Sequence, residues 1–468
     1  MQAATGEGYL EPEASSRLEA QIPNGVAPKT AATASDLVGR GRPAGRDAAA
    51  LVVQTGAMAA IAAFSAAPCF ALPDGASVRG GGIEFSNPDP ATLQIRQEQR
   101  RGAVDFNSFN IRANERVLIQ QPDAKSLFLG RVVGGLGPSK IDGLLKANGG
   151  VILLNPQGLL IGPSGSVNTA SFMASTLDAN PEQFLSGGPL RLWKPTSGPA
   201  EGQILNQGSI SVAEGGLAAL VGANISNEGL ISARMGTVVL ASGQSATLDV
   251  NGDGLITLAV SDEVLNSLIN QQGTIQAPGG AIWIGASHLG GALTSVVNVG
   301  GLVQANSMEE LLGGEAISAP AGAITVAGKQ VKLQGTLEAQ HLIEAPASSQ
   351  TAFRDHAVSA ADASVPLQGV SLEPSSLFAQ GQANDEVNRF YDGSIDILGE
   401  NIQLIGAVLN VNGTRGGGQI RIGGDQRGAN PQLLNAKSVL IDQASSISAD
   451  AIDNGDGGRV IVDRKSVV

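Results

Sequence analysis

The sequence predicts an all-β protein, a right-handed parallel β-helix (a solenoid) with small extrahelical β elements. Three observations favour this fold. Of 468 residues 63 are glycine and only 3% are aromatic, so the core must consist of small aliphatic side chains. Such cores are typical of solenoids, in which each coil contacts only its neighbours. Charged residues make up 15%, against roughly 25% in ordinary soluble domains. Short apolar runs also recur at a regular spacing.

The regular spacing is clearest after residue 200. Asn206-Gln207-Gly208 returns as Asn227-Glu228-Gly229 after 21 residues, and Gln272-Gly273 follows with Gly273 44 residues beyond Gly229. We interpret 44 as two further steps of 22. A coil of this length can turn at Gly and Asn corners and hydrogen-bond to the next coil at about 4.8 Å. Residues 75–468 would then form roughly 15 to 19 coils.

Strand-sized apolar runs fill the space between these turns. The predicted strands are Gly216–Val221, Thr237–Leu240, Leu255–Val260, Ala281–Ile284, Ala323–Val326, Ser394–Leu398, Ile402–Ile405 and Gly418–Ile422. Only Glu263–Asn270 is predicted as a short helix or turn. A chain of β-sandwiches is the competing architecture, but it would show stronger polar alternation and more aromatic residues.

The N-terminal segment has the layout of a secretory signal peptide. Three arginines between residues 40 and 46 precede an apolar run, Ala48–Ala67, and small residues follow at Cys69 and Ala71. We expect a signal peptide over residues 40–71, with cleavage between Ala71 and Leu72. The mature chain would then contain no cysteine. A membrane anchor is the alternative, but the run is short and rich in alanine.

Residues 1–39 are rich in Ala, Pro, Glu and Ser. This composition is typical of disorder. We interpret the segment as a disordered leader, or as the result of a start codon placed too early.

One block within residues 75–180 is the most characteristic part of the chain. It includes Asp105–Ile111, Arg131–Gly134, Pro138–Gly143 and Asn155-Pro156-Gln157-Gly158-Leu159. The block resembles the two-partner secretion (haemagglutination activity) domain at the N-terminus of filamentous haemagglutinin-like exoproteins. Asn155–Leu159 is similar to the family's Asn-Pro-Asn-Gly-Ile motif, with Gln157 and Leu159 as substitutions. A second family motif, Asn-Pro-Asn-Leu, is absent.

The resemblance implies export and a division of the chain. An outer-membrane barrel transporter with periplasmic polypeptide-transport-associated domains would carry the protein through the periplasm and outer membrane to the cell surface or the extracellular space. The expected parts are a secretion domain (72–185), β-helix repeats (186–342), a loop or extrahelical insertion (343–388) and further repeats of a longer polypeptide (389–468). The implied function is that of an adhesin or surface structural protein, with a host or cell-surface glycan or protein as its ligand.

No residue pattern points to catalysis, a cofactor or a metal. Asp249-Val250-Asn251-Gly252-Asp253-Gly254 begins like a calcium loop, but the twelfth position is Val260, where a bidentate glutamate is needed. We interpret it as a turn between strands. His288, His341 and His356 lie far apart in the sequence. A net charge of −13 argues against nucleic acid as a partner.

A β-helical polysaccharide-active enzyme is the alternative function. It would need several carboxylates gathered on one face of successive coils. Asp249, Asp253 and Asp262 are the nearest candidates, but they fall within one coil's length of chain. We therefore expect no enzyme.

Overall fold

The computed structural model describes residues 72–195, 202–243, 245–250, 256–261, 267–286, 295–312, 315–342, 393–430 and 433–464. The chain divides into two units, residues 1–65 and 66–468, and every described residue belongs to the second. The predicted leader and signal peptide up to Ala71 and the predicted insertion over residues 343–388 lie outside the described residues. In the described ranges no helix is long and apolar enough to span a membrane.

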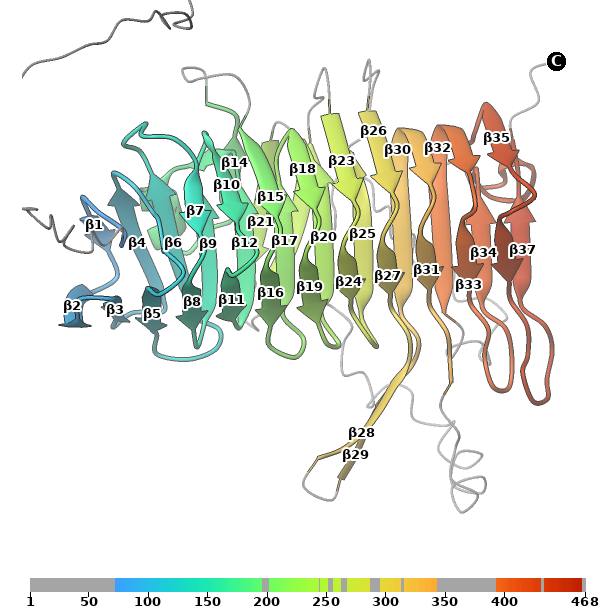
Figure 1. Cartoon of the computed structure of the whole chain (residues 1–468), viewed down its shortest axis with the longest axis horizontal. Coiled ribbons are helices and arrows are strands. Elements are labelled where there is room, and N and C mark those ends of the chain that lie inside the picture. The colour runs from blue at the N-terminus through green and yellow to red at the C-terminus, as the bar shows by residue number, and fades with distance from the viewer. Residues whose placement is uncertain are drawn as a thin grey trace, which may run out of the picture. The chain divides into compact units, whose positions relative to one another are not determined.

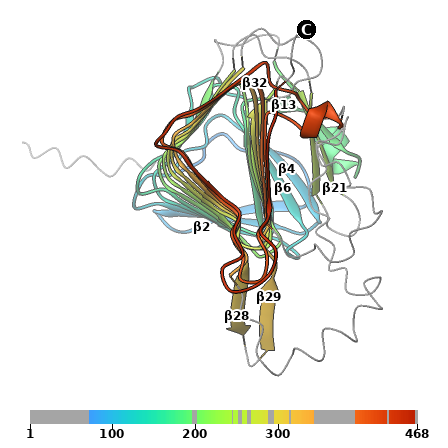
Figure 2. The same ribbon diagram turned by 90° about the vertical axis from the view of Figure 1, so that its right-hand side faces the viewer.

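The described chain winds into a right-handed parallel β-helix, so the predicted fold class is confirmed. Seen along its axis, each coil has three sides (Figure 2). Successive coils lie side by side from the blue end to the red end of the chain (Figure 1). We call the three sides face 1, face 2 and face 3. Faces 1 and 3 belong to one 19-stranded sheet, and face 2 is a separate 12-stranded sheet.

Within each coil the chain passes through face 1, then face 2, then face 3. Face 1 therefore contains the first strand of each coil from Ser139 onward. They are β7 (Ser139–Ile141), β10 (Gly158–Ile161), β15 (Gln203–Asn206), β18 (Asn224–Asn227), β23 (Ser267–Gln271), β26 (Ser295–Val299) and β35 (Ser438–Ile441). Two long strands, β30 (Ala323–Leu333) and β32 (Ser394–Leu404), run from face 3 into face 1.

Face 2 contains one strand from each described coil and, at its start, the antiparallel strand β2. They are β2 (Ile83–Asp89), β3 (Thr92–Gln97), β5 (Arg116–Gln120), β8 (Leu144–Ala147), β11 (Ser166–Thr169), β16 (Ser209–Val212), β19 (Leu230–Ala233), β24 (Thr274–Gln276), β27 (Leu302–Gln304), β31 (Thr336–Glu338), β33 (Val408–Asn410) and β36 (Ser446–Ser448).

Face 3 completes the coil. Its strands are β1 (Ser77–Gly80), β4 (Arg101–Phe106), β6 (Leu127–Val132), β9 (Gly150–Leu154), β12 (Ser171–Ser175), β17 (Leu217–Val221), β20 (Thr237–Ser242), β25 (Ala281–Ala286), β34 (Gln419–Ile422) and β37 (Arg459–Val462). β1 runs antiparallel to β4, and β2 runs antiparallel to β3. These two strands therefore cover the start of the solenoid.

The inner core consists of aliphatic side chains stacked in register from coil to coil. On face 2, Ile210 lies beside Ile231, which lies beside Ile275. On face 1, Ile225 lies beside Ile269 in the same way. One buried cluster runs from Leu93 to Ala449. The apolar side chains inside each coil are therefore buried in part by stacking on the next coil.

Face 3 is also covered on its outside. β13 (Asp178–Ala179), β14 (Leu190–Trp193), β21 (Ser245–Val250) and β22 (Ile256–Ser261) form an antiparallel sheet beside a short helix, α1 (Pro181–Leu185). Phe184 of α1 and Leu192 of β14 pack in a second buried cluster with Leu129 and Ile152 of face 3. This double burial explains why every residue of β9 is buried and apolar or glycine.

Two smaller elements complete the described chain. A hairpin of β28 (Met308–Leu312) and β29 (Glu315–Ala319) projects from the coils (Figures 1 and 2). A 3₁₀ turn, η1, covers Gln426–Gly428.

Three sequence expectations were wrong. The 44 residues after Gly229 are one coil, not two, because β19 pairs directly with β24. The additional length includes the extrahelical hairpin of β21 and β22, which pairs with β14. The described part of the predicted helix or turn, residues 267–270, belongs to strand β23 (Ser267–Gln271), because buried Ile269 stacks on Ile225. Coils with such insertions are longer than 21 residues. The expected 15 to 19 coils are therefore too many, because the described residues contain only 12 strands on face 2.

Candidate functional site

The predicted secretion motif, Asn155–Leu159, contains the corner between β9 and β10 and the first two residues of β10. Asn155 is 1% exposed. Its Oδ1 accepts a hydrogen bond from the Gln157 backbone N–H at 2.9 Å. Its carbonyl oxygen accepts another from the Gly158 N–H, also at 2.9 Å. Asn155 therefore begins both an Asx-turn, through its side chain, and a β-turn, through its backbone carbonyl. Asparagine suits this position because its short side-chain amide can bond to the backbone two residues further on.

The same asparagine also joins its coil to both neighbours. Its Nδ2 donates to the Gly137 carbonyl oxygen at 3.1 Å and to Ser139 Oγ at 3.0 Å. Its backbone N–H donates to the Ser175 carbonyl oxygen at 3.0 Å. Ser139 begins β7 in the preceding coil, and Ser175 ends β12 in the following coil. Asn155 therefore fixes three coils at one corner.

Gly158 is required at this corner for two reasons. Its φ is +114°, a value that side chains other than glycine rarely adopt. A Cβ at Gly158 would also lie 2.6 Å from the carbonyl oxygen of Gln203 in the following coil. Leu159, the next residue, is 1% exposed and belongs to the inner core. Pro156 and Gln157 are half-buried, so the motif exposes little of itself.

A chain of four alternating charges ties the start of the solenoid to the extrahelical sheet. Asp105 accepts from Arg79 Nε at 2.7 Å and from Arg131 Nη1 at 2.9 Å. Arg131 also makes a two-pronged pair with Asp178, at 2.9 and 3.2 Å. The four residues come from β1, β4, β6 and β13. The side chain of Asp105 is 3% exposed, and that of Arg131 is 13% exposed.

Burial and pairing act in opposite directions on Arg131. Loss of water lowers the pKa of its guanidinium, but hydrogen bonds and charge from Asp178 and Asp105 raise it, and the net pKa is raised. The guanidinium is therefore charged at every pH that the protein meets. Asp105 has two such cations at hydrogen-bond distance, which compensates for the burial of its charge.

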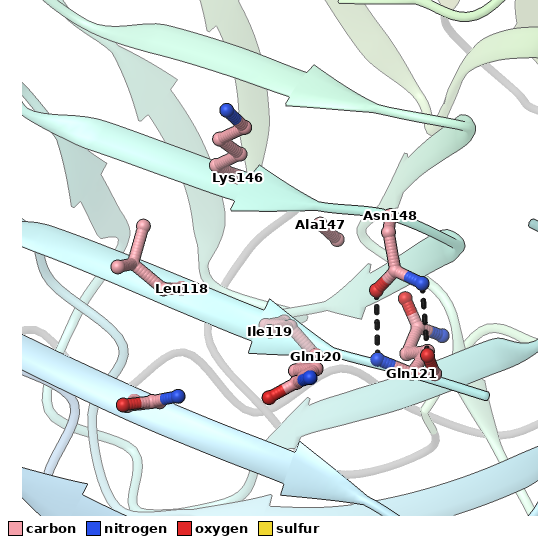
Figure 3. A pocket seen from close by; sticks show the side chains of 8 residues that line it. Leu118, Ile119, Gln120, Gln121, Lys146, Ala147 and Asn148 are labelled. Atoms are coloured by element: carbon pink, nitrogen blue, oxygen red, sulfur yellow. Dashed lines mark hydrogen bonds between the residues drawn. The ribbon is translucent and has the colours of Figure 1, made fainter. Parts of the chain in front are cut away.

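A hollow of about 520 Å³ lies on the outside of face 2 (Figure 3). Gln94, Leu118, Gln120 and Lys146 are among the residues that line it. At one end Asn148 pairs with the Gln121 backbone, accepting at 2.7 Å and donating at 2.8 Å. The lining contains one cation and no carboxylate. It therefore lacks the carboxylate pair that glycoside hydrolysis uses.

Those of the other candidate residues that the structure describes form no site. No group of three or more His, Cys, Asp or Glu side chains in the described ranges could hold a metal ion. Asp249 lies on β21, opposite Thr257 of β22. Asp253 and Asp262 lie outside the described residues, as do His288 and His356. His341 forms a backbone bridge with Gly413.

The fold and this corner define a class of protein, a right-handed parallel β-helix domain with an extrahelical sheet. A family model described as the TPS secretion domain matches residues 71–311. The chain belongs to this family, that of two-partner secretion domains. The resemblance noted in the sequence is confirmed.

Two relatives are named heme/hemopexin-binding protein, both from Haemophilus influenzae. One is 34% identical over 213 residues, which are 44% of this chain and 23% of the relative. The other is 36% identical over 96 residues, which are 20% of this chain and 10% of the relative. The chain thus matches only about a quarter of the length of the first relative.

A solved structure, the HMW1 secretion domain from Haemophilus influenzae, resembles the fold. The TM-score is 0.61 at 23% identity, and the match covers 84% of this chain and 96% of that chain. Family members are secreted across the outer membrane to the cell surface or the extracellular space, and this chain is a secreted protein of that kind. Its family is one of secretion domains, not of enzymes.

Proposed function

We propose that this chain is the secreted component of a two-partner system and that Asn155–Leu159 belongs to its secretion signal. The partner is an outer-membrane barrel transporter, and its periplasmic polypeptide-transport-associated domains bind the secretion domain. The observation that carries the proposal is the position of Asn155. One buried side chain fixes three coils within the segment that resembles the family's motif.

The test separates a signal from a merely structural asparagine. Asn155→Ala and a control, Asn227→Ala, each remove a buried amide that joins neighbouring coils. Both full-length variants are produced together with the transporter, and secreted protein and urea unfolding midpoints are measured. We expect Asn155→Ala to lower export at least tenfold more than Asn227→Ala, at a comparable loss of stability. Equal export of the two variants would contradict the assignment of the motif.

The proposal includes removal of the signal peptide between Ala71 and Leu72. Leu72 packs against the inner core, which favours a mature chain that keeps this residue. N-terminal sequencing of secreted protein tests this. The expected first residue is Leu72, and a secreted chain that retains Ala48–Ala67 would refute the cleavage.

Outside the cell we propose the function of an adhesin or surface structural protein. A solenoid gains stability coil by coil as it emerges from a transporter. Its mature chain needs no disulfide, because Cys69 is the only cysteine and precedes the cleavage position. A host or cell-surface glycan or protein is the proposed ligand. Binding of purified secreted protein to host cells, with and without enzymatic removal of surface glycans, measures this function.

The name of the relatives favours a second candidate, binding of haem or haemopexin. The observation behind it is 34% identity to a heme/hemopexin-binding protein. Titration of the secreted protein with hemin, followed by visible absorbance, and with haemopexin, followed by calorimetry, distinguishes the two candidates. Saturable binding in either titration would replace the adhesin proposal.

A further inference from the structure

The hollow on the outside of face 2 is built around Leu118 (Figure 3). This half-buried leucine lies in the middle of β5, between its register partners Gln94 of β3 and Lys146 of β8. Gln120, two residues further along β5, lies on the same face of the sheet. Leu118 therefore offers an apolar surface with polar side chains on three sides.

Further along face 2 the amide side chains bond from one coil to the next. Gln276 Nε2 donates to Gln304 Oε1 at 3.2 Å. Gln304 Nε2 in turn donates to Glu338 Oε2 at 2.7 Å. Side chains in such a ladder satisfy one another, so fewer of their polar groups remain for a ligand.

No such ladder forms in the hollow, because Leu118 separates Gln94 from Lys146 in the row. Within the described ranges the side chains of Gln94 and Gln120 have no hydrogen-bond partner in the protein. Each amide has two donor hydrogens and an acceptor oxygen. The hollow therefore presents two amides that are free to bond to a ligand.

Lys146 is an exposed cation with no carboxylate beside it. Its register partners are Leu118 and Asn168, and the outward residues before and after it along the chain are Leu144 and Asn148. Among the described residues it has no ion-pair partner, although the sequence has 42 acidic and only 29 basic residues. A cation so placed favours a ligand with a negative charge.

We infer that the hollow binds an acidic saccharide, whose carboxylate pairs with Lys146 and whose hydroxyls bond to the amides of Gln94 and Gln120. The inference rests on the proposed adhesin function, for which it names the site and the class of glycan. The apolar face of a sugar ring packs on Leu118. The volume of about 520 Å³ lies within the roughly 300–1,000 Å³ of small-molecule sites, which combine apolar surface with a few convergent polar groups.

Haem also carries carboxylates, on its propionate groups, but the hollow does not suit it. Protein ligands of haem iron are histidine, cysteine, methionine or tyrosine. None of these residue types is among those that line the hollow. A hemin titration therefore serves as a control, and it should give the same result with and without the Lys146 charge.

The experiment titrates purified secreted protein with sialyllactose, a hyaluronan tetrasaccharide and neutral lactose, followed by calorimetry. The first two probes carry a sialic acid and a uronic acid, so they distinguish two sources of a sugar carboxylate. The variants are Lys146→Met, Lys146→Arg and Gln120→Leu. The control is Lys140→Met, which removes the same charge from an exposed position on β7 of face 1.

At least one acidic probe should bind saturably, and lactose should bind more weakly. Lys146→Met should weaken binding of the acidic probe about tenfold or more, and Gln120→Leu about fivefold. Lys146→Arg keeps the charge, so it should bind as the unchanged protein does, and so should Lys140→Met. Export and urea unfolding midpoints should stay the same in all four variants, because the replaced side chains are exposed.

Equal binding of lactose and the acidic probes, or equal affinities of Lys146→Met and Lys140→Met, would overturn the inference. Hemin binding that Lys146→Met weakens, without saccharide binding, would also overturn it. If neither acidic probe binds but removal of host glycans still abolishes cell binding, the adhesin proposal stands and only the hollow is excluded. Absence of cell binding by the unchanged protein would refute the proposed adhesin function itself.

Discussion

Asn227 donates a hydrogen bond from Nδ2 to the Oε1 of Gln271 at 2.7 Å, across 44 residues of sequence. Its own Oδ1 accepts from Asn206 Nδ2, also at 2.7 Å. All three side chains are 0% exposed. Three coils are thus joined by a ladder of amides inside an otherwise aliphatic core. Such a ladder is stable because each buried donor has an acceptor.

Asn227→Ala should destabilise the protein by about 1–3 kcal/mol, since the Oε1 of Gln271 and one donor of Asn206 lose their partners in the core. Urea unfolding measures this. The control is Asn298→Ala, which removes a similar bond between coils, to Asn270 at 2.8 Å, from a half-buried position. Water can replace that bond, so the control should cost less. An equal cost for both variants would show that burial of the ladder is unimportant.

Gly229→Ala should destabilise the protein by about 1–3 kcal/mol or more, as overpacking does. A Cβ at this corner would overlap the carbonyl oxygen of Gly208 in the preceding coil. Gly188→Ala is the matched control, because a Cβ there meets nothing within 4 Å, and its effect should stay within about 0.5 kcal/mol. The unfolding temperatures of the two variants measure this difference in stability. A stable Gly229→Ala protein would contradict the close stacking of the corners.

Arg131→Gln should cost about 3 kcal/mol, because it removes one cation from buried Asp105 and the cation that pairs with Asp178. The control is Arg96→Gln. Arg96 is 61% exposed and lies 3.8 Å from Glu84, so its loss should change stability by less than about 1 kcal/mol. Urea unfolding compares the two variants. Equal effects would mean that the chain of charges does not hold the extrahelical sheet to the solenoid.

Acid should unfold the protein partly through Asp123. The Ser126 hydroxyl donates to Asp123 Oδ1 at 2.8 Å and is the main cause of the lowered pKa of this carboxyl. The unfolded chain, with an aspartate pKa of about 3.9, then binds the proton more readily than the folded chain does. The stabilisation is therefore complete above about pH 4 and is lost as the pH falls through the folded pKa.

Ser126→Ala brings the pKa of Asp123 closer to its ordinary value. Its unfolding temperature should therefore fall less between pH 5 and pH 3 than that of the unchanged protein, each compared with its own value at pH 7. Thermal unfolding at these pH values measures the difference. If the unfolding temperatures of the two proteins fell equally between pH 5 and pH 3, Asp123 would not contribute to unfolding in acid.

The solenoid could be predicted because its corners leave a local pattern in the sequence. Gly208, Gly229 and Gly273 occupy one corner in three coils, and a Cβ at either of the last two would overlap the carbonyl of the glycine before it. The buried amides of Asn206 and Asn227 explain why asparagine precedes two of these glycines. Few other residue types fit such a corner, so the repeat can be recognised in the sequence alone.

The coil count could not be predicted, because an insertion can have the length of a coil. β21 and β22 are strand-like in sequence, and only their pairing with β14 places them outside the solenoid. The motif at Asn155 was found through its resemblance to a family, but the hydrogen bonds of its side chain to Gly137 and Ser139 depend on tertiary structure. The ion pair of Asp105 and Arg131 could have been predicted from one feature of the sequence. The two residues carry opposite charges and lie 26 residues apart, on strands of neighbouring coils.

The central claim is that export depends on a dedicated outer-membrane transporter. The most direct measurement is the amount of the full-length chain in the medium and on the cell surface, with and without the cognate transporter gene, at equal levels of synthesis. With the transporter, folded protein should accumulate outside the cell. Without it, protein should remain in the periplasm or be degraded there. Equal extracellular amounts in both strains would contradict two-partner secretion for this chain.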